Sequence, residues 1–144
     1  LGRNYTYPIA LEGALKIKEI SYIHCEALLS SEMKHGPIAL LDKNFPILYF
    51  ISTDKNTILK EISNLYEIKT RTNNIVLFAS SSILNKLGKK FLDEINYIKI
   101  PDTQSELVPI FFTLSIQFLS FYFAKLKKIP VDQPRNLAKV VTVA

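Results

Sequence analysis

The sequence predicts a single α/β domain in which two layers of helices enclose a mostly parallel β-sheet. Three short apolar runs, at residues 46–51, 75–79 and 97–100, have the length and composition of buried strands. Helical segments flank these runs, and such alternation is typical of a parallel sheet covered on both faces. The length of 144 residues suits one domain, and the sequence shows no internal boundary.

The first helix is predicted to begin at Pro8, because proline lacks an N–H that the first turn of a helix does not need. We expect it to run to about Leu29, with His24 in its middle. Residues 30–37 then form a polar loop that ends in Gly36-Pro37.

Two further helices are predicted from spacing. Residues 55–71 carry Ile58, Ile62, Leu65 and Ile68 on one side. Residues 106–128 form a long apolar helix, and the tail from residue 129 onward is expected to begin irregularly because it contains two prolines.

The composition indicates a globular protein, with 48% apolar and 22% charged residues. The net charge is +5, but the lysines are scattered and arginine is rare, which argues against a nucleic-acid reader. Cys25 is the sole cysteine, so no internal disulfide can form and a reducing, cytoplasmic location fits. We expect Cys25 to be a small buried hydrophobe.

Residues 107–124 carry no charge and approach the length of a membrane span, but polar side chains interrupt them. A core or subunit-interface helix is the favoured interpretation, and no membrane role is expected. The chain starts with Leu1 rather than methionine, and residues 1–3 resemble the end of a strand. We therefore expect a fragment of a longer protein.

Glu12, Lys16 and Glu19 are the main candidates for chemistry. Their spacing places them within a ~60° arc of one helix face, with apolar residues in or beside that arc: Ile9, Leu15, Ile20 and Ile23. A charge in apolar surroundings is unfavourable unless it is paired. Two interpretations stay open from spacing alone, a buried ion network that orients the helix and an acid/base cluster in a polar cleft.

His35 and the polar tail at residues 132–139 are further candidates. A histidine beside a Gly-Pro turn can reach a ligand or a neighbouring subunit, although it can equally be a solvent-exposed residue. The tail can close over a small polar ligand or simply dock the C-terminus. No Gly-rich phosphate loop or dinucleotide fingerprint is present, and one cysteine with two histidines does not suit a structural zinc site.

The segments Tyr7–Tyr22, Glu32–Pro37 and Asp132–Val143 closely resemble parts of the glutamine–fructose-6-phosphate aminotransferase family. The match is to the second sugar-isomerase (SIS) subdomain, and it covers essentially the whole chain, residues 1–144 with a C-terminal tail at 129–144. The resemblance implies the SIS, flavodoxin-like fold. It also implies a parent enzyme that makes glucosamine 6-phosphate from fructose 6-phosphate and glutamine without a metal or redox cofactor.

The resemblance further implies residue roles. Glu19 would move a proton between C1 and C2 of the sugar, while Glu12 and Lys16 would support its oxygens and developing charge. His35 would assist ring opening, in the active site of the other subunit of a homodimer. Lys139 would engage the open-chain carbonyl, as lysines do when they form Schiff bases.

Two departures qualify the resemblance. Asn4 stands where the family usually has glycine, a change that asparagine's tolerance of left-handed geometry softens. The family's phosphate loop lies in a first SIS subdomain and its glutamine nucleophile in a glutaminase domain, and neither is in this sequence. Two alternatives remain: an SIS deglycase or deaminating isomerase, and a sugar-phosphate-sensing regulatory module.

Overall fold

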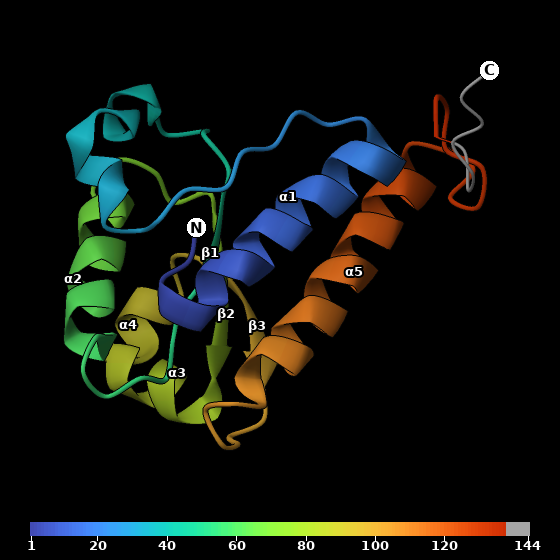
Figure 1. Ribbon diagram of the computed structural model, residues 1–144. Coiled ribbons are helices and arrows are strands. Elements are labelled where there is room, and N and C mark those ends of the chain that lie inside the picture. The colour runs from blue at the N-terminus through green and yellow to red at the C-terminus, as the bar shows by residue number, and fades with distance from the viewer. Residues whose placement is uncertain (138–144) are drawn as a thin grey trace.

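A computed structural model describes residues 1–137 of the protein (Figure 1). Within these residues a parallel sheet has the order β1 (Ile47–Phe50), β2 (Ile75–Ser80) and β3 (Asn96–Ile100), with β2 in the middle. The three predicted strands are confirmed, and the sheet with helices on both faces gives the predicted three-layer α/β architecture.

Successive side chains of each strand point to opposite faces, so the sheet builds two separate cores. On one face lie α1 (Tyr7–Ser21) and α5 (Val108–Leu126), where Phe50 and Phe78 stack with ring centroids 4.3 Å apart and Phe112 packs on both. The other face carries α2 (Ile58–Lys69), α3 (Ser81–Leu87) and α4 (Lys89–Leu92) (Figure 1). The sequence pattern did not single out α3 and α4.

Helix α1 is shorter than predicted. It ends at Ser21 because Tyr22 takes a left-handed conformation, with φ of 55°, and donates its N–H to the Lys18 carbonyl. The chain beyond pairs with Gly2, whose N–H reaches the Leu28 carbonyl at 3.3 Å and whose carbonyl accepts from Ser30 N–H at 2.9 Å. The prediction of a helix to Leu29 was wrong because this long-range pairing needs extended backbone.

His24 consequently lies in the connection after α1, where it is exposed, and not in the middle of a helix as predicted. Cys25 is half-buried against the α1/α5 core, close to the expected buried hydrophobe, and burial raises the pKa of its thiol.

The first residues hold the start of α1 at the carboxyl end of β1. Leu1 hydrogen-bonds Leu48 O and Phe50 N, which is the pattern of a neighbouring parallel strand. Asn4 adopts the left-handed conformation that the sequence allowed, with φ of 51°, and donates to the Asp54 carboxylate at 3.0 Å. Thr6 Oγ1 donates to Phe50 O at 2.9 Å.

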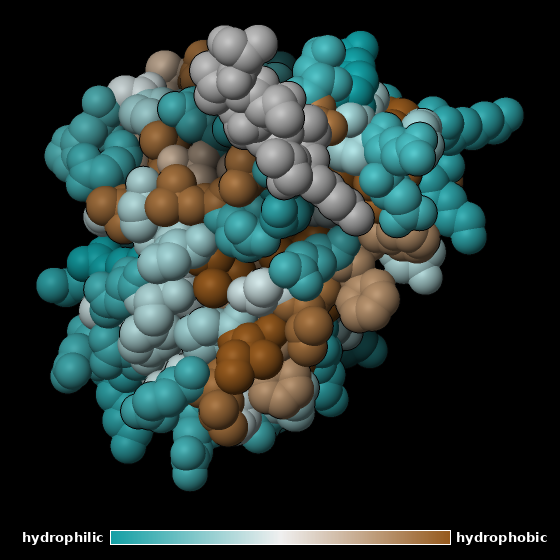
Figure 2. All heavy atoms as spheres, turned by 45° about the vertical axis from the view of Figure 1, so that its right-hand side comes forward, coloured by the Kyte–Doolittle hydropathy of each residue, from teal (hydrophilic) through white to brown (hydrophobic). Residues whose placement is uncertain are grey.

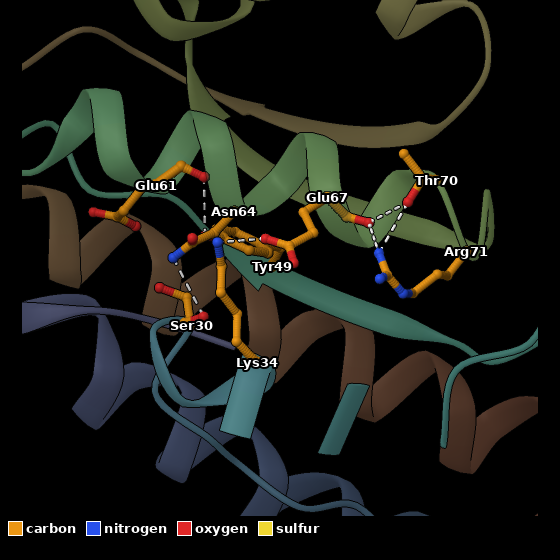
Figure 3. Close-up of polar contacts among 8 residues, drawn as sticks. All are labelled: Ser30, Lys34, Tyr49, Glu61, Asn64, Glu67, Thr70 and Arg71. Atoms are coloured by element: carbon orange, nitrogen blue, oxygen red, sulfur yellow. Dashed lines mark hydrogen bonds and ion pairs between the residues drawn. The ribbon is translucent and has the colours of Figure 1, made fainter. Parts of the chain in front are cut away.

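The polar loop after residue 30 contains two 3₁₀ turns, η2 (Glu32–His35) and η3 (Pro37–Leu40), and α2 holds the first of them in place. The Asn64 amide donates to Ser30 O at 3.3 Å, and Lys34 pairs with Glu67 at 2.5 Å (Figure 3). The loop that carries His35 is therefore part of the α2 side of the molecule.

Helix α5 is long and apolar enough to cross a membrane by length and composition alone, and 28% of that stretch is buried inside the domain. Val108, Phe112 and Ile116 are fully buried against the sheet and α1. These contacts make α5 part of the domain core, as the sequence predicted for residues 106–128.

Glu61 is a fully buried carboxylate in the first turn of α2. It accepts hydrogen bonds from Ser52 N–H at 3.3 Å and from the Thr57 hydroxyl at 3.4 Å, and Tyr49 donates to its backbone carbonyl (Figure 3). Burial raises the pKa of this carboxyl to about 7, although the hydrogen bonds and the Arg3 charge oppose the rise.

We expect Glu61 to make stability fall as pH rises. Because the folded-state pKa lies above the ordinary value of 4.5, folding binds a proton, so its stabilising effect is complete below pH 4.5 and is lost as pH rises through about 7. Glu61→Gln is expected to remove up to about 3 kcal/mol of this pH dependence. Urea denaturation at pH 5 and pH 8 measures it, with the exposed Glu106→Gln as control. Equal pH dependence in all three proteins would contradict the prediction.

Candidate functional site

The outward face of α1 brings together the three charged residues that the sequence singled out. The side chains of Glu12, Lys16 and Glu19 are 32%, 33% and 27% exposed. Lys16 Nζ lies 2.7 Å from Glu19 Oε2 and 3.9 Å from Glu12 Oε1, so the ammonium bonds to one carboxylate and borders the other.

The opposite face of α1 explains this orientation. Ala10, Gly13, Ala14 and Ile17 are buried, and these small or apolar residues let α1 approach α5 closely. A Cβ atom on Gly13 would lie only 2.6 Å from Ile116 Cγ1. Since no larger side chain fits there, the packing fixes the rotation of α1 and turns the charged face outward.

The charged face is more open than the sequence indicated. Ile9 is buried beside it, but Leu15 is 44% exposed, and Ile23 lies beyond the end of α1 and is 38% exposed. The sequence predicted charges embedded in an apolar face: the neighbouring side chains are apolar, but the helix face itself is open to solvent.

This openness separates the two interpretations of the charged residues. The hydrogen bond to Glu19 raises the pKa of Lys16, and the charges of Glu19 and Glu12 add to the rise. Ion pairs that are about one third exposed contribute only up to ~1 kcal/mol to stability. A structural network is therefore a weak explanation, whereas two carboxylates with a cation between them suit proton transfer and charge stabilisation.

His35 lies apart from this face. His35 ends η2 on the α2 side and is exposed, and no hydrogen bond or ion pair in the described part of the chain links it to α1. Lys139 lies outside the described residues. The beginning of the tail does reach α1, because Arg135 contacts Tyr22 just after the helix ends.

Tyr22 was not among the predicted residues, because its partner Arg135 is 113 residues away and local spacing carries no signal of the contact. Among residues 1–137 no group of three or more His, Cys, Asp and Glu side chains is close enough to hold a metal ion. A surface hollow of about 320 Å³ lies near the C-terminal end of α2, between Tyr66, Lys69 and Phe91. It does not include the charged face of α1.

The fold agrees with the comparison to known families. The model of the SIS domain matches residues 1–127, and the chain therefore belongs to the SIS domain family. This confirms the fold that the sequence resemblance implied.

The chain is also similar to individual enzymes. The chain is 44% identical to the glutamine–fructose-6-phosphate aminotransferase (isomerizing) of Escherichia coli and 43% identical to that of Chlorobaculum tepidum, over 99% of its own length. It spans only about a fifth of the length of these relatives, 23% and 22%. The resemblance to this enzyme family is thereby confirmed.

Solved structures of other proteins have the same fold as this chain. The C-terminal domain of glucosamine-fructose-6-phosphate aminotransferase from Francisella tularensis matches with a TM-score of 0.82 and 41% identity, covering 92% of this chain and 36% of that one. Tagatose-6-phosphate ketose/aldose isomerase from Escherichia coli matches with a TM-score of 0.77 at 16% identity, covering 99% of this chain and 39% of that one, which shows a shared fold alone.

Proposed function

We propose that the chain is the second SIS subdomain, residues 1–144, of an isomerizing glutamine–fructose-6-phosphate aminotransferase. The whole enzyme would convert fructose 6-phosphate and glutamine-derived ammonia into glucosamine 6-phosphate in the cytoplasm. One observation carries the proposal: Lys16 sits between Glu12 and Glu19 on an open helix face, in a chain 43–46% identical to enzymes of that name.

Glu19 would transfer the proton between C1 and C2 of the sugar. Converting a ketose into an aldose requires one base that removes a proton from C1 and returns it to C2. Glu19 is about a quarter exposed and is hydrogen-bonded to Lys16, so it is accessible to substrate and already oriented. We assign it the role of the base.

Lys16 and Glu12 would stabilise the negative charge that develops on the sugar during the reaction. An enolamine intermediate carries developing negative charge on oxygen, and a preoriented ammonium stabilises it without reorganisation. Glu12, 3.9 Å from that ammonium, would hold Lys16 and a sugar hydroxyl. Lys139 would engage the open-chain carbonyl, and its amine is the group that forms a Schiff base.

The remainder of the site would come from other parts of the assembly. The charged face is open, so it needs an opposing surface to exclude water around the sugar. We assign the phosphate-binding part to a first SIS subdomain, the ammonia supply to a glutaminase domain, and His35 to the site of a second subunit. His35 suits that role because it is exposed and lies on the α2 side. No metal or redox cofactor takes part in these steps.

The decisive experiment uses a chimera. This chain replaces the corresponding segment of the Escherichia coli relative, and glucosamine 6-phosphate formation is measured. We expect an active chimera, a loss of 10²-fold or more in kcat with Glu19→Gln, and little change with the exposed Glu106→Gln. The purified 144-residue chain alone should form no product. Full activity of the Glu19→Gln chimera would refute the assignment.

The outer face of α5 supports a homodimer in this proposal. Ile110, Leu114, Phe118 and Tyr122 recur every four residues and are 49–64% exposed. Figure 2 shows apolar side chains gathered on the side of the molecule that α5 occupies, bordered by hydrophilic ones. A row of large apolar side chains of this kind is typical of a surface that another protein surface covers.

We propose that a second copy of the chain binds this face. Analytical ultracentrifugation, which measures self-association, tests this proposal. Phe118→Asp is expected to weaken self-association by about tenfold or more, because a large aromatic anchor is replaced by a charge. Leu59→Asp serves as control, since Leu59 is 78% exposed but lies on α2 in the other layer. A monomeric wild-type chain, or equal effects of both substitutions, would contradict a dimer through α5.

A further inference from the structure

The turn η2, which carries His35, is attached to α2 at both of its ends. Just before it, the side-chain amide of Asn64 donates to the backbone carbonyl of Ser30 at 3.3 Å. Near its end, the ammonium of Lys34 lies 2.5 Å from a carboxylate oxygen of Glu67. Asn64 and Glu67 are three residues apart on α2, so they lie on one face of that helix about one turn apart (Figure 3). One face of α2 therefore holds both ends of the turn.

A third contact secures the middle of η2. The Met33 side chain is 4% exposed and lies in the same apolar core as Leu65 and Ile68 of α2. Its burial keeps the turn on the domain even when a polar contact is lost. The ion pair between Lys34 and Glu67 has a different effect. Its side chains are 46% and 31% exposed, so it adds little to stability, but it fixes the direction in which the turn points.

His35 is the residue whose direction these contacts set. It follows Lys34 directly, and its side chain is exposed. Gly36 comes next with φ of 143°, a conformation that residues with a Cβ rarely adopt, so the chain changes direction there. The ion pair with Glu67 is therefore one residue before the imidazole, and a glycine is one residue after it.

We propose that Glu67 and Asn64 are positioning residues, which hold the His35 imidazole in the direction it needs to reach the active site of a second subunit. The inference rests on the proposed function, which gives His35 its role there. Opening of the fructose 6-phosphate ring breaks the bond between C2 and the ring oxygen. The ring oxygen gains a proton and the anomeric hydroxyl loses one, which leaves a carbonyl at C2. An imidazole transfers such a proton only when it lies within about 3 Å of the oxygen concerned.

The chimera with the Escherichia coli relative measures the effect on catalysis. Glu67→Gln keeps the size of the side chain and removes its charge. Because a misplacement of about 1 Å can cost about 10²-fold and Met33 still retains the turn, we expect kcat to fall about tenfold. The KM for fructose 6-phosphate should change less than about twofold. Asn64→Leu should act in the same way. Lys34→Glu combined with Glu67→Lys exchanges the two charges and should restore most of the lost activity.

Glu94→Gln is the matched control. It breaks the ion pair between Glu94 and Lys69, which joins α2 to the segment after α4 and not to η2. Its kcat should equal that of the unmodified chimera, whereas a general need for ion pairs on α2 would lower kcat in Glu94→Gln as well. Equal kcat in the unmodified, Glu67→Gln and Asn64→Leu chimeras overturns the inference.

A mixed dimer tests which subunit uses the imidazole. One subunit carries Glu67→Gln and the other carries Glu19→Gln. If each His35 serves the neighbouring site, one of the two sites combines an intact Glu19 with an intact turn, and the purified heterodimer should keep about half of the unmodified kcat. If each His35 serves its own subunit, the only site with Glu19 has the weakened turn, and kcat falls to about one twentieth. The second result overturns the inference.

Hydrogen exchange of the 144-residue chain follows the turn without substrate or partner. Backbone amides of residues 32–36 should exchange at least about threefold faster in Glu67→Gln and Asn64→Leu than in the wild type or Glu94→Gln, while those of β2 should not change. If Asn64→Leu fails to fold, Glu67→Gln still decides the matter. Unchanged exchange in Glu67→Gln overturns the inference.

His35→Ala in the chimera separates this inference from the proposed function. If His35→Ala lowers kcat but Glu67→Gln and Asn64→Leu do not, His35 keeps its proposed role and the positioning by α2 is refuted. If His35→Ala leaves kcat unchanged, the role proposed for His35 is refuted. Faster exchange of residues 32–36 in Glu67→Gln would then support the attachment of η2 to α2 and count against its use in catalysis.

Discussion

The close approach of Gly13 to Ile116 is the constraint on which the rest of the structure depends. A Cβ at Gly13 would lie 2.6 Å from Ile116 Cγ1, so α1 and α5 can pack in this way only with glycine at that position. The contact places α1 against the sheet with Ala10, Ala14 and Ile17 inward. The contact therefore sets the rotation of α1 at which Glu12, Lys16 and Glu19 point outward.

An outward charged face has consequences for how the domain can work. The charges are near enough to interact, yet about one third exposed, so they add little to stability and remain available to a ligand. The charged face is held rigidly and is open, so a site built on it requires a second surface to exclude water. The apolar row of α5 is exposed, and the Tyr22–Arg135 contact brings residue 135 to the end of α1.

Many features of this protein could be predicted from local sequence patterns, because apolar runs and helical spacing determine them. The strands, α5 and the shared face of Glu12, Lys16 and Glu19 followed from apolar runs and helical period. The premature end of α1 did not, because the pairing of Gly2 with residues 28–30 demands extended chain. The Tyr22–Arg135 contact was equally invisible, since its partners meet only in the folded protein, and burial of Glu61 depends on packing around α2.

A double-mutant cycle between Gly13 and Ile116 tests the central claim most directly. Gly13→Ala should destabilise the wild type by about 1–2 kcal/mol, because the new methyl group overpacks the contact. In the Ile116→Ala background the same change should be neutral or stabilising, since the space is open and alanine favours the helix. Urea denaturation of the four proteins gives the coupling. Equal effects of Gly13→Ala in both backgrounds would show that this contact does not set the position of α1.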